Sequence, residues 1–135
     1  MKILIADDDP VYVRLVAGRL TAKGIEVVTA YGATQAWMTT VRSQPDAIIM
    51  DINMPAGGHE FLKSLRMMAK TAHIPVVVVS GSISPEEKSK VMGSGADEFL
   101  PKPADFDKVY AALRRLLGTH PPESRSETER PAASG

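Results

Sequence analysis

The chain has 135 residues, its 16 Lys and Arg balance 16 Asp and Glu to a formal net charge of zero, and it has no cysteine. Zero net charge argues against bulk electrostatic binding to nucleic acid or an anionic membrane, and the lack of cysteine excludes disulfides and thiolate metal sites. The length suits one domain, and no apolar run approaches the roughly 20 residues of a membrane-spanning helix. We therefore expect a cytoplasmic protein without direct nucleic-acid or membrane contacts.

The first expected elements are a buried strand and an amphipathic helix. The strand, Ile3 to Ala6, ends at three consecutive aspartates. The last of these, Asp9, precedes Pro10, which predicts a helix with Asp9 as its N-cap and proline at its first position. Gly24 is expected to end this helix. The apolar spacing predicts an inward face made of Tyr12, Leu15, Val16 and Leu20.

A second strand and helix follow, and then a strand of a different kind. The β-branched stretch from Glu26 to Ala30 predicts a short strand, and the next helix must stop before Pro45. The inward face of that helix is expected to carry Ala36, Trp37, Thr40 and Val41. Ala47 to Asp51 then places four apolar residues directly before one carboxylate, as in a strand buried on both faces of a parallel sheet.

The second half of the chain continues the alternation of strands and helices. A glycine-containing loop, Ala56 to Gly58, precedes a helix whose expected inward residues are Phe61, Leu62, Leu65 and Met68. Pro75 to Val79 predicts a fourth strand, and Ser84 to Glu87 forms a capping box that opens the fourth helix. Glu98 to Leu100 is a short last strand. A final helix, expected to end at Gly118, presents Phe106, Val109, Tyr110, Leu113 and Leu117 on one side.

Five strands that alternate with five helices predict an α/β fold, a doubly wound parallel sheet with helices on both faces. Polar residues follow four of the strands: Asp7 and Asp8 the first, Asp51 the third, Ser80 the fourth and Lys102 the fifth. In open α/β sheets, ligands bind beyond the carboxyl ends of the strands. The sequence therefore places these five side chains at one edge.

The residue types at this edge fit phosphoryl transfer. Three carboxylates in one place repel one another unless a cation intervenes, and Mg²⁺ suits a few carboxylates together with water and phosphate oxygens. Asp51 is then a candidate nucleophile that forms an aspartyl phosphate. Lys102 supplies a compact positive charge and Ser80 a hydroxyl donor.

Each of these residues also has a purely structural interpretation. The three aspartates before Pro10 can cap a helix, and Asp51 can open an Asx turn before Pro55. Ser80 can be a turn residue, and Lys102 can be a solvated loop lysine. The functional interpretation is favoured because chance rarely places all of these polar residues at successive strand ends.

Four stretches together resemble a response-regulator receiver domain. They are Ile3 to Pro10, Pro45 to Pro55, Val79 to Gly81 and Gly95 to Pro103, and the resemblance covers about residues 2–118. It implies a flavodoxin-like, CheY-like fold with five parallel strands in the order 2-1-3-4-5 and five flanking helices. It also implies two-component or phosphorelay signalling in the cytoplasm, in which the phosphorylated domain controls the binding of a partner.

The resemblance assigns roles around the acceptor. Asp51 becomes the phosphorylation site, and Asp7 and Asp8 form an acidic pocket for Mg²⁺, with Asp8 the more direct ligand. Asp51 and the backbone carbonyl of Asn53 complete the protein ligands of the metal. No further cofactor is implied, and no enzymatic turnover of a metabolite is expected.

The resemblance also implies how the signal leaves the site. Lys102 pairs with the phosphate, and the Lys102–Pro103 peptide is typically cis in this family. Ser80 and Phe99 form the switch, in which the hydroxyl moves toward the phosphoryl group and the ring turns inward. The face made by the fourth helix, last strand and last helix then changes shape.

The resemblance implies a sensor histidine kinase or a phosphotransfer protein as the donor, a downstream protein target, and a monomer or a phosphorylation-dependent dimer. The loop from Ala56 to Glu60 departs from the family pattern, because it is one residue shorter and lacks the usual acidic residue before the glycine. Two other functions compete with this one. One is a phosphorylation-independent interaction module of the same fold; the other, an aspartyl phosphatase, is disfavoured because Asn53 replaces its second acid.

We expect residues 1–118 to form the receiver domain and 119–135 a disordered tail, since the tail has no periodic apolar face. The tail is too short and mixed in charge to be a DNA-reading module. Two possibilities stay open: the domain acts alone through protein contacts, or it is one part of a longer protein.

Overall fold

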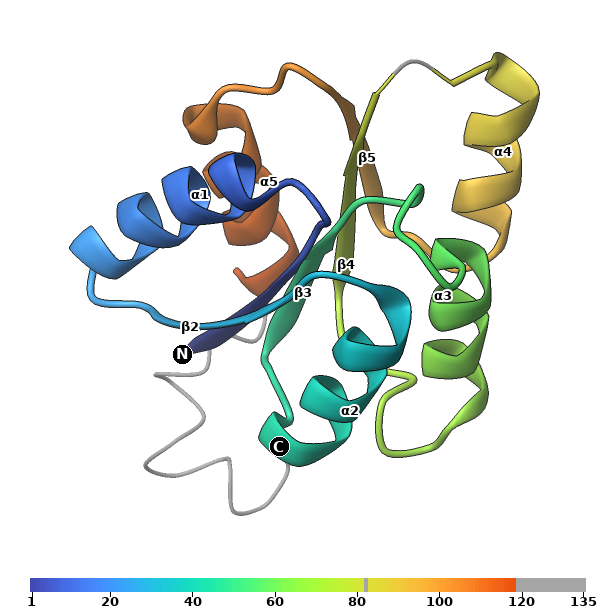
Figure 1. Cartoon of the computed structure of the whole chain (residues 1–135), viewed down its shortest axis with the longest axis horizontal. Coiled ribbons are helices and arrows are strands. Elements are labelled where there is room, and N and C mark those ends of the chain that lie inside the picture. The colour runs from blue at the N-terminus through green and yellow to red at the C-terminus, as the bar shows by residue number, and fades with distance from the viewer. Residues whose placement is uncertain (82, 119–135) are drawn as a thin grey trace.

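A computed structural model of the protein describes residues 1–81 and 83–118. The tail predicted to be disordered, residues 119–135, lies outside the described residues. Strands and helices alternate along the chain (Figure 1). In order they are β1 (Lys2–Ala6), α1 (Pro10–Ala22), β2 (Glu26–Ala30), α2 (Ala33–Ser43), β3 (Ala47–Met50), α3 (Gly58–Met67), β4 (Val76–Ser80), α4 (Pro85–Gly93), β5 (Glu98–Pro101) and α5 (Phe106–Leu117).

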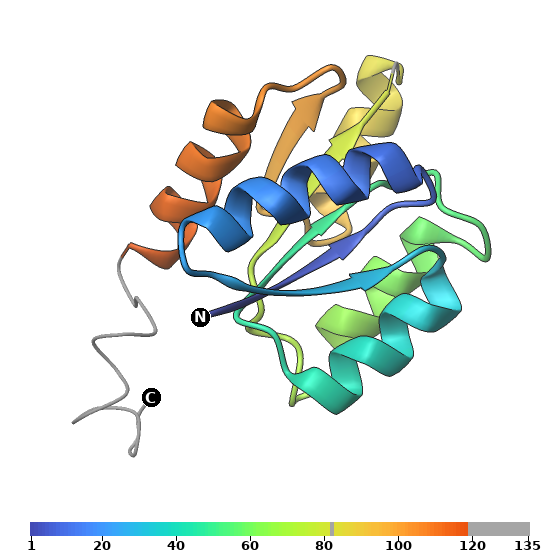
Figure 2. The same ribbon diagram turned by 60° about the vertical axis from the view of Figure 1, so that its left-hand side comes forward.

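The strands form one parallel sheet in the order β2-β1-β3-β4-β5, which confirms the predicted fold class. The register is continuous across the centre, where Ile49 pairs with Ile5 on one side and with Val77 on the other. The sheet is covered on both faces: α2, α3 and α4 pack on one, and α1 and α5 on the other (Figures 1 and 2).

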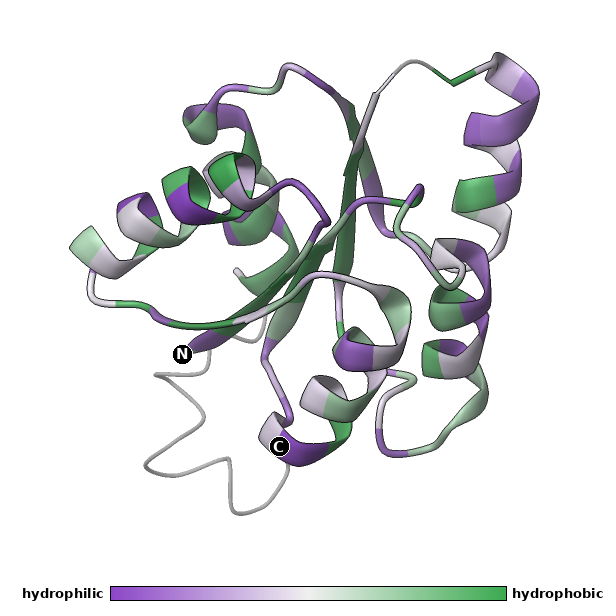
Figure 3. Ribbon diagram, viewed as in Figure 1, coloured by the Kyte–Doolittle hydropathy of each residue, from purple (hydrophilic) through white to green (hydrophobic). Residues whose placement is uncertain are grey.

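The core lies in two layers because successive strand residues point to opposite faces. Leu4 and Ala6 of β1 join the cluster under α2, α3 and α4, whereas Ile3 and Ile5 join the cluster under α1 and α5. Every residue of β3 and β4 is buried, as expected for central strands of a doubly covered sheet. Figure 3 shows these strands as the hydrophobic centre of the molecule.

The helices begin where the capping residues predicted. The Asp9 side chain accepts hydrogen bonds from the backbone N–H groups of Val11 and Tyr12, which fixes the start of α1 directly after the acidic residues. Ser84 and Glu87 form the complete capping box at the start of α4. These caps place the first turn of α1 beside the carboxyl end of β1.

The inward faces were predicted with errors. In α1 the buried apolar residues are Val13, Val16 and Leu20, while Leu15 is 58% exposed. Val13 is three residues before Val16 and lies on its side of the helix, whereas Leu15 precedes it by one and points elsewhere. Val41 and Met68 are likewise exposed, whereas Thr40 and Leu65 of the same predicted faces are buried.

The short loop after β3 brings α3 close to the sheet edge. Ala56 and Gly57 both have positive φ values, 69° and 95°, and α3 then begins at Gly58. A side chain at Gly58 would overlap the backbone carbonyl of Ile52, so only glycine allows this close approach. The start of α3 therefore packs on the segment that follows Asp51.

Within the described residues, no helix is both long and apolar enough to cross a membrane.

Candidate functional site

The segments after β1, β3, β4 and β5 meet at one edge of the sheet, as predicted (Figure 1). Asp7 and Asp51 are buried there, with exposed fractions of 1% and 8%, whereas Asp8 is exposed. One carboxylate oxygen from each of the three lies within 4.8 Å of the others. The parallel register thus gathers three acids that are 44 positions apart in the sequence at their widest.

Lys102 reaches two of these acids. Its Nζ lies 2.8 Å from Asp7 Oδ2 and 3.3 Å from Asp51 Oδ2. The lysine backbone is held by β4, because its N–H donates a hydrogen bond to the Ser80 carbonyl at 2.7 Å. The Lys102–Pro103 peptide is cis, as the resemblance implied. The solvated-loop interpretation of Lys102 is therefore wrong.

Ser80 and Asn53 orient the other oxygen of Asp51. The buried Ser80 hydroxyl donates to Asp51 Oδ1 at 2.7 Å, and the Asn53 backbone N–H donates to the same atom at 2.9 Å. The Asn53 side chain in turn donates to Ser80 Oγ at 3.3 Å. The contact of Asp51 with the Asn53 N–H is the Asx turn that the structural interpretation predicts. Its contacts with Ser80 and Lys102 are those that the functional interpretation predicts.

The charges of the site are unequally buried. Burial is the main cause that raises the pKa of Asp7, and the hydrogen bonds from Lys102 and the Asp9 N–H lower it by less. Burial lowers the pKa of Lys102, but the hydrogen bonds and charge of Asp7 and Asp51 outweigh it and raise that pKa. The ion pair therefore stabilises the charged form of the more exposed Lys102. It does not fully offset the cost of burying the negative charge of Asp7.

This donor set fits a hard divalent cation. Asp7, Asp8 and Asp51 offer only oxygen atoms, which Mg²⁺ prefers, and the exposed Asp8 leaves one side open for retained waters. Asn53 lies next to the carboxylate through its N–H contact, so its carbonyl stays a predicted ligand. A cation here would compensate the charge of the buried acids, which pair with no cationic side chain other than Lys102 among residues 1–81 and 83–118.

The predicted switch residues share one face of the sheet. Phe99 pairs with Val78, and Ser80 follows Val78 by two residues, so their side chains point to the same side. Phe99 is half-buried against the cluster formed by α2, α3 and α4, and Lys88 Nζ lies 5.6 Å from its ring centroid. The arrangement allows a change at Ser80 to reach the side of β5 that faces α4.

Two features of the site escaped the sequence analysis. Tyr12 was expected only in the core, yet its ring centroid lies 4.7 Å from Lys102 Nζ. The Asn53 side chain was given no role, yet it bonds Ser80. The signal available for Tyr12 was its place in the first turn of α1, directly after the acidic run.

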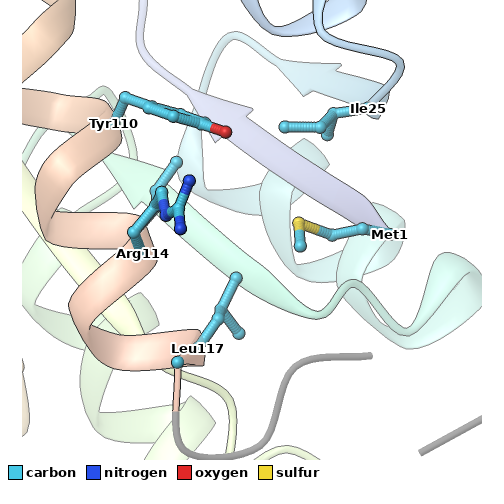
Figure 4. Close-up of a pocket in the computed structure, with 7 residues that line it drawn as sticks. Met1, Ile25, Tyr110, Arg114 and Leu117 are labelled. Atoms are coloured by element: carbon cyan, nitrogen blue, oxygen red, sulfur yellow. The ribbon is translucent and has the colours of Figure 1, made fainter. Parts of the chain in front are cut away.

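A cavity elsewhere is separate from this edge. It has a volume of about 290 Å³ and lies between the start of β1, β2 and the last turns of α5 (Figure 4). It is lined by Met1, Ile25, Tyr110, Leu113, Arg114, Leu117 and Gly118. None of the acids, the serine or the lysine of the site contributes to its wall.

Known proteins share the sequence pattern and the fold of this chain. The family model of the response regulator receiver domain matches residues 3–114. The chain is 35% identical over 117 residues to the DNA-binding dual master transcriptional regulator RpaA of Synechocystis, covering 86% of this chain and 48% of RpaA. It is also 35% identical over 116 residues to the response regulator PleD of Caulobacter vibrioides, covering 85% of this chain and 26% of PleD.

Solved structures show the same fold. The chemotaxis response regulator CheY4 of Vibrio cholerae superposes with a TM-score of 0.80 at 32% identity, covering 86% of this chain and 98% of that one. The chain spans about half or less of the two curated relatives named above. Phosphorylation-dependent two-component signalling is the general function of the matched family, whose receiver domains generally bind Mg²⁺ at an acidic pocket. By its sequence match and its fold, this chain belongs to the response regulator receiver domain family.

Proposed function

We propose that this chain accepts a phosphoryl group on Asp51 and uses it to control the binding of a protein partner. The observation that carries the proposal is the pair of contacts on this carboxylate. Ser80 donates to one of its oxygens, and the Lys102 ammonium lies within 3.3 Å of the other. A hydroxyl donor and a fixed positive charge beside one nucleophile are the groups that a transferring phosphoryl needs.

The transfer itself is a balanced displacement at phosphorus. An Asp51 oxygen forms a new bond to phosphorus, while the bond from phosphorus to the donor breaks and its electron pair leaves with the donor. With a phosphohistidine donor the leaving nitrogen takes up a proton, and with an acyl phosphate a carboxylate leaves. Lys102 compensates the charge of the phosphoryl oxygens, and Ser80 donates a hydrogen bond to one of them.

Asp7, Asp8 and Asp51 are the side chains that would hold Mg²⁺, together with the Asn53 carbonyl. The bound ion would neutralise part of the phosphoryl charge. Asp8 is suited to a hydrated ion because it is exposed, and Asp7 is suited to a fixed ligand because it is buried and oriented by the Asp9 N–H at 2.9 Å.

The signal to a partner protein would begin with a change in the hydrogen bond that the Ser80 hydroxyl donates. Phosphorylation adds roughly −1.5 to −2 charge and three acceptor oxygens. Ser80 already contacts Asp51, so it needs only to shift its hydrogen bond from the carboxylate to a phosphoryl oxygen. Phe99 then turns inward on the same sheet face, and the surface of α4, β5 and α5 changes. A histidine kinase or phosphotransfer protein is the proposed donor.

A phosphoryl mimic tests acceptor and switch together. Beryllofluoride with Mg²⁺ is expected to shift the NMR signals of the Phe99 ring, and EDTA added beforehand is expected to abolish the shift. The matched control is Asp51→Asn, which keeps an acceptor oxygen for Ser80 and loses the charge.

The outcomes separate the claims. A response that is equal in wild type and Asp51→Asn would remove Asp51 from its role as the acceptor. No response in either chain would favour the phosphorylation-independent interaction module. Binding of the mimic with an unchanged Phe99 ring would refute the switch alone.

A further inference from the structure

Tyr12 lies where the core and the acidic site meet. It belongs to the first turn of α1, and its half-buried ring packs against the cluster under α1 and α5. Its ring centroid is 4.7 Å from Lys102 Nζ, a distance at which the ring face attracts a cation. Its hydroxyl is buried and has no hydrogen-bond partner among the described residues.

The ammonium of Lys102 therefore has three close neighbours of two kinds. Two are carboxylates, Asp7 at 2.8 Å and Asp51 at 3.3 Å, and the third is the face of the Tyr12 ring. In the proposed function both carboxylates would change their partners, because both would hold Mg²⁺ and Asp51 would carry the phosphoryl group. The ring is the only one of these three contacts that the reaction does not redirect.

Lysine needs such a contact more than a rigid side chain would. Its ammonium sits on a flexible four-carbon stem, and 23% of the side chain is exposed, so solvent competes for the charge. When a divalent cation binds the same acids, repulsion favours the movement of the ammonium away from the site. An aromatic face on the protein side opposes that movement without adding a negative charge that would hold the metal more tightly.

We propose that Tyr12 is a positioning residue for phosphoryl transfer, whose ring face keeps the Lys102 ammonium at Asp51 while the carboxylates exchange their partners. This inference rests on the proposed function. The active feature is the ring and not the hydroxyl, because the ring face lies over the ammonium whereas the hydroxyl makes no hydrogen bond to any described residue. The side chain acts through Lys102 and does not itself touch the reacting atoms.

The test compares rates of phosphoryl uptake from acetyl phosphate with Mg²⁺ in the full chain, followed by intact mass. Tyr12→Phe keeps the ring face and is expected to react within about twofold of wild type. Tyr12→Leu keeps apolar bulk and removes the ring, and is expected to react about three- to tenfold more slowly, the size of a partly buried cation–π contact. Thermal melting of each variant checks that the fold is retained.

Fluorinated phenylalanines at position 12 separate attraction of the cation from simple packing. Ring fluorines withdraw charge from the ring face with little change in shape, so the rate is expected to fall stepwise as fluorines are added. A merely packed ring would leave the rate unchanged along this series, and that result would overturn the inference.

Equal rates for Tyr12→Leu and wild type would also overturn the inference, as would an equal loss in Tyr12→Phe and Tyr12→Leu, which would assign the effect to the hydroxyl. A wild-type chain that takes up no phosphoryl group would refute the proposed function itself and this inference with it. The two failures are therefore distinguishable in one set of measurements.

Discussion

Asp51→Asn is expected to abolish phosphoryl uptake from acetyl phosphate completely while the chain remains folded. The amide retains an oxygen that can accept from Ser80 and from the Asn53 N–H, so the hydrogen bonds that orient the side chain survive. The amide is not a nucleophile toward phosphorus, and it leaves Lys102 with Asp7 as its remaining acid. Intact mass spectrometry after incubation with acetyl phosphate and Mg²⁺ measures the loss.

Asp107→Asn is the matched control for this experiment. Asp107 is exposed in the first turn of α5, and its replacement removes the same charge without touching the site. It is expected to take up one phosphoryl group as the wild type does. Uptake by Asp51→Asn at the rate of this control would show that another residue is the acceptor.

Asp7→Asn is expected to stabilise the metal-free protein at neutral pH while it impairs phosphoryl transfer. Burial raises the pKa of Asp7 in the folded state, so the ionised carboxylate disfavours folding once it forms. The amide removes this charge and keeps an acceptor oxygen for the Asp9 N–H. The same change is expected to weaken the acidic pocket, because one of the proposed carboxylate ligands is lost.

The difference in the free energy of unfolding between Asp7→Asn and wild type is expected to depend on pH. Below the unfolded-state pKa, near the ordinary value of 3.8, Asp7 is protonated in both states, and the free energies of unfolding of wild type and variant should converge. The advantage of the variant should grow as the pH rises and be complete above the folded-state pKa. Urea unfolding in EDTA across this range measures it.

A variant that is less stable than wild type at neutral pH would contradict this account of Asp7. It would mean that the ion pair with Lys102 outweighs the cost of burial. The expected result instead describes a site that keeps a destabilising charge because its chemistry needs one, a trade that functional sites commonly make.

The sheet could be predicted because its signals are local and strong. The apolar run before Asp51 is short and ends at turn residues, which is typical of a buried strand, and the caps at Asp9 and Ser84 fix where two helices begin. The parallel alternation then determines which ends of the strands meet. Strand order is not a local property, and it came from the family resemblance.

The side chains at the boundary between core and site could not be placed in the same way. Helical periodicity assigned Tyr12 to the core and said nothing of Lys102, because only the tertiary structure brings the start of α1 near the residue that follows β5. The error at Leu15 has the same origin, since spacing along one helix does not say which of two adjacent faces meets the sheet. Side-chain contacts across elements require the tertiary structure.

The central claim is that Asp51 itself carries the phosphoryl group, and reduction by borohydride tests it most directly. An aspartyl phosphate is an acyl phosphate, so borohydride converts the phosphorylated residue to homoserine, which peptide sequencing by mass spectrometry locates. After treatment of the wild type with acetyl phosphate and Mg²⁺, we predict homoserine at position 51 and at no other aspartate. Homoserine at Asp7 or Asp8, or a phosphoryl group on a serine that resists reduction, would contradict the account.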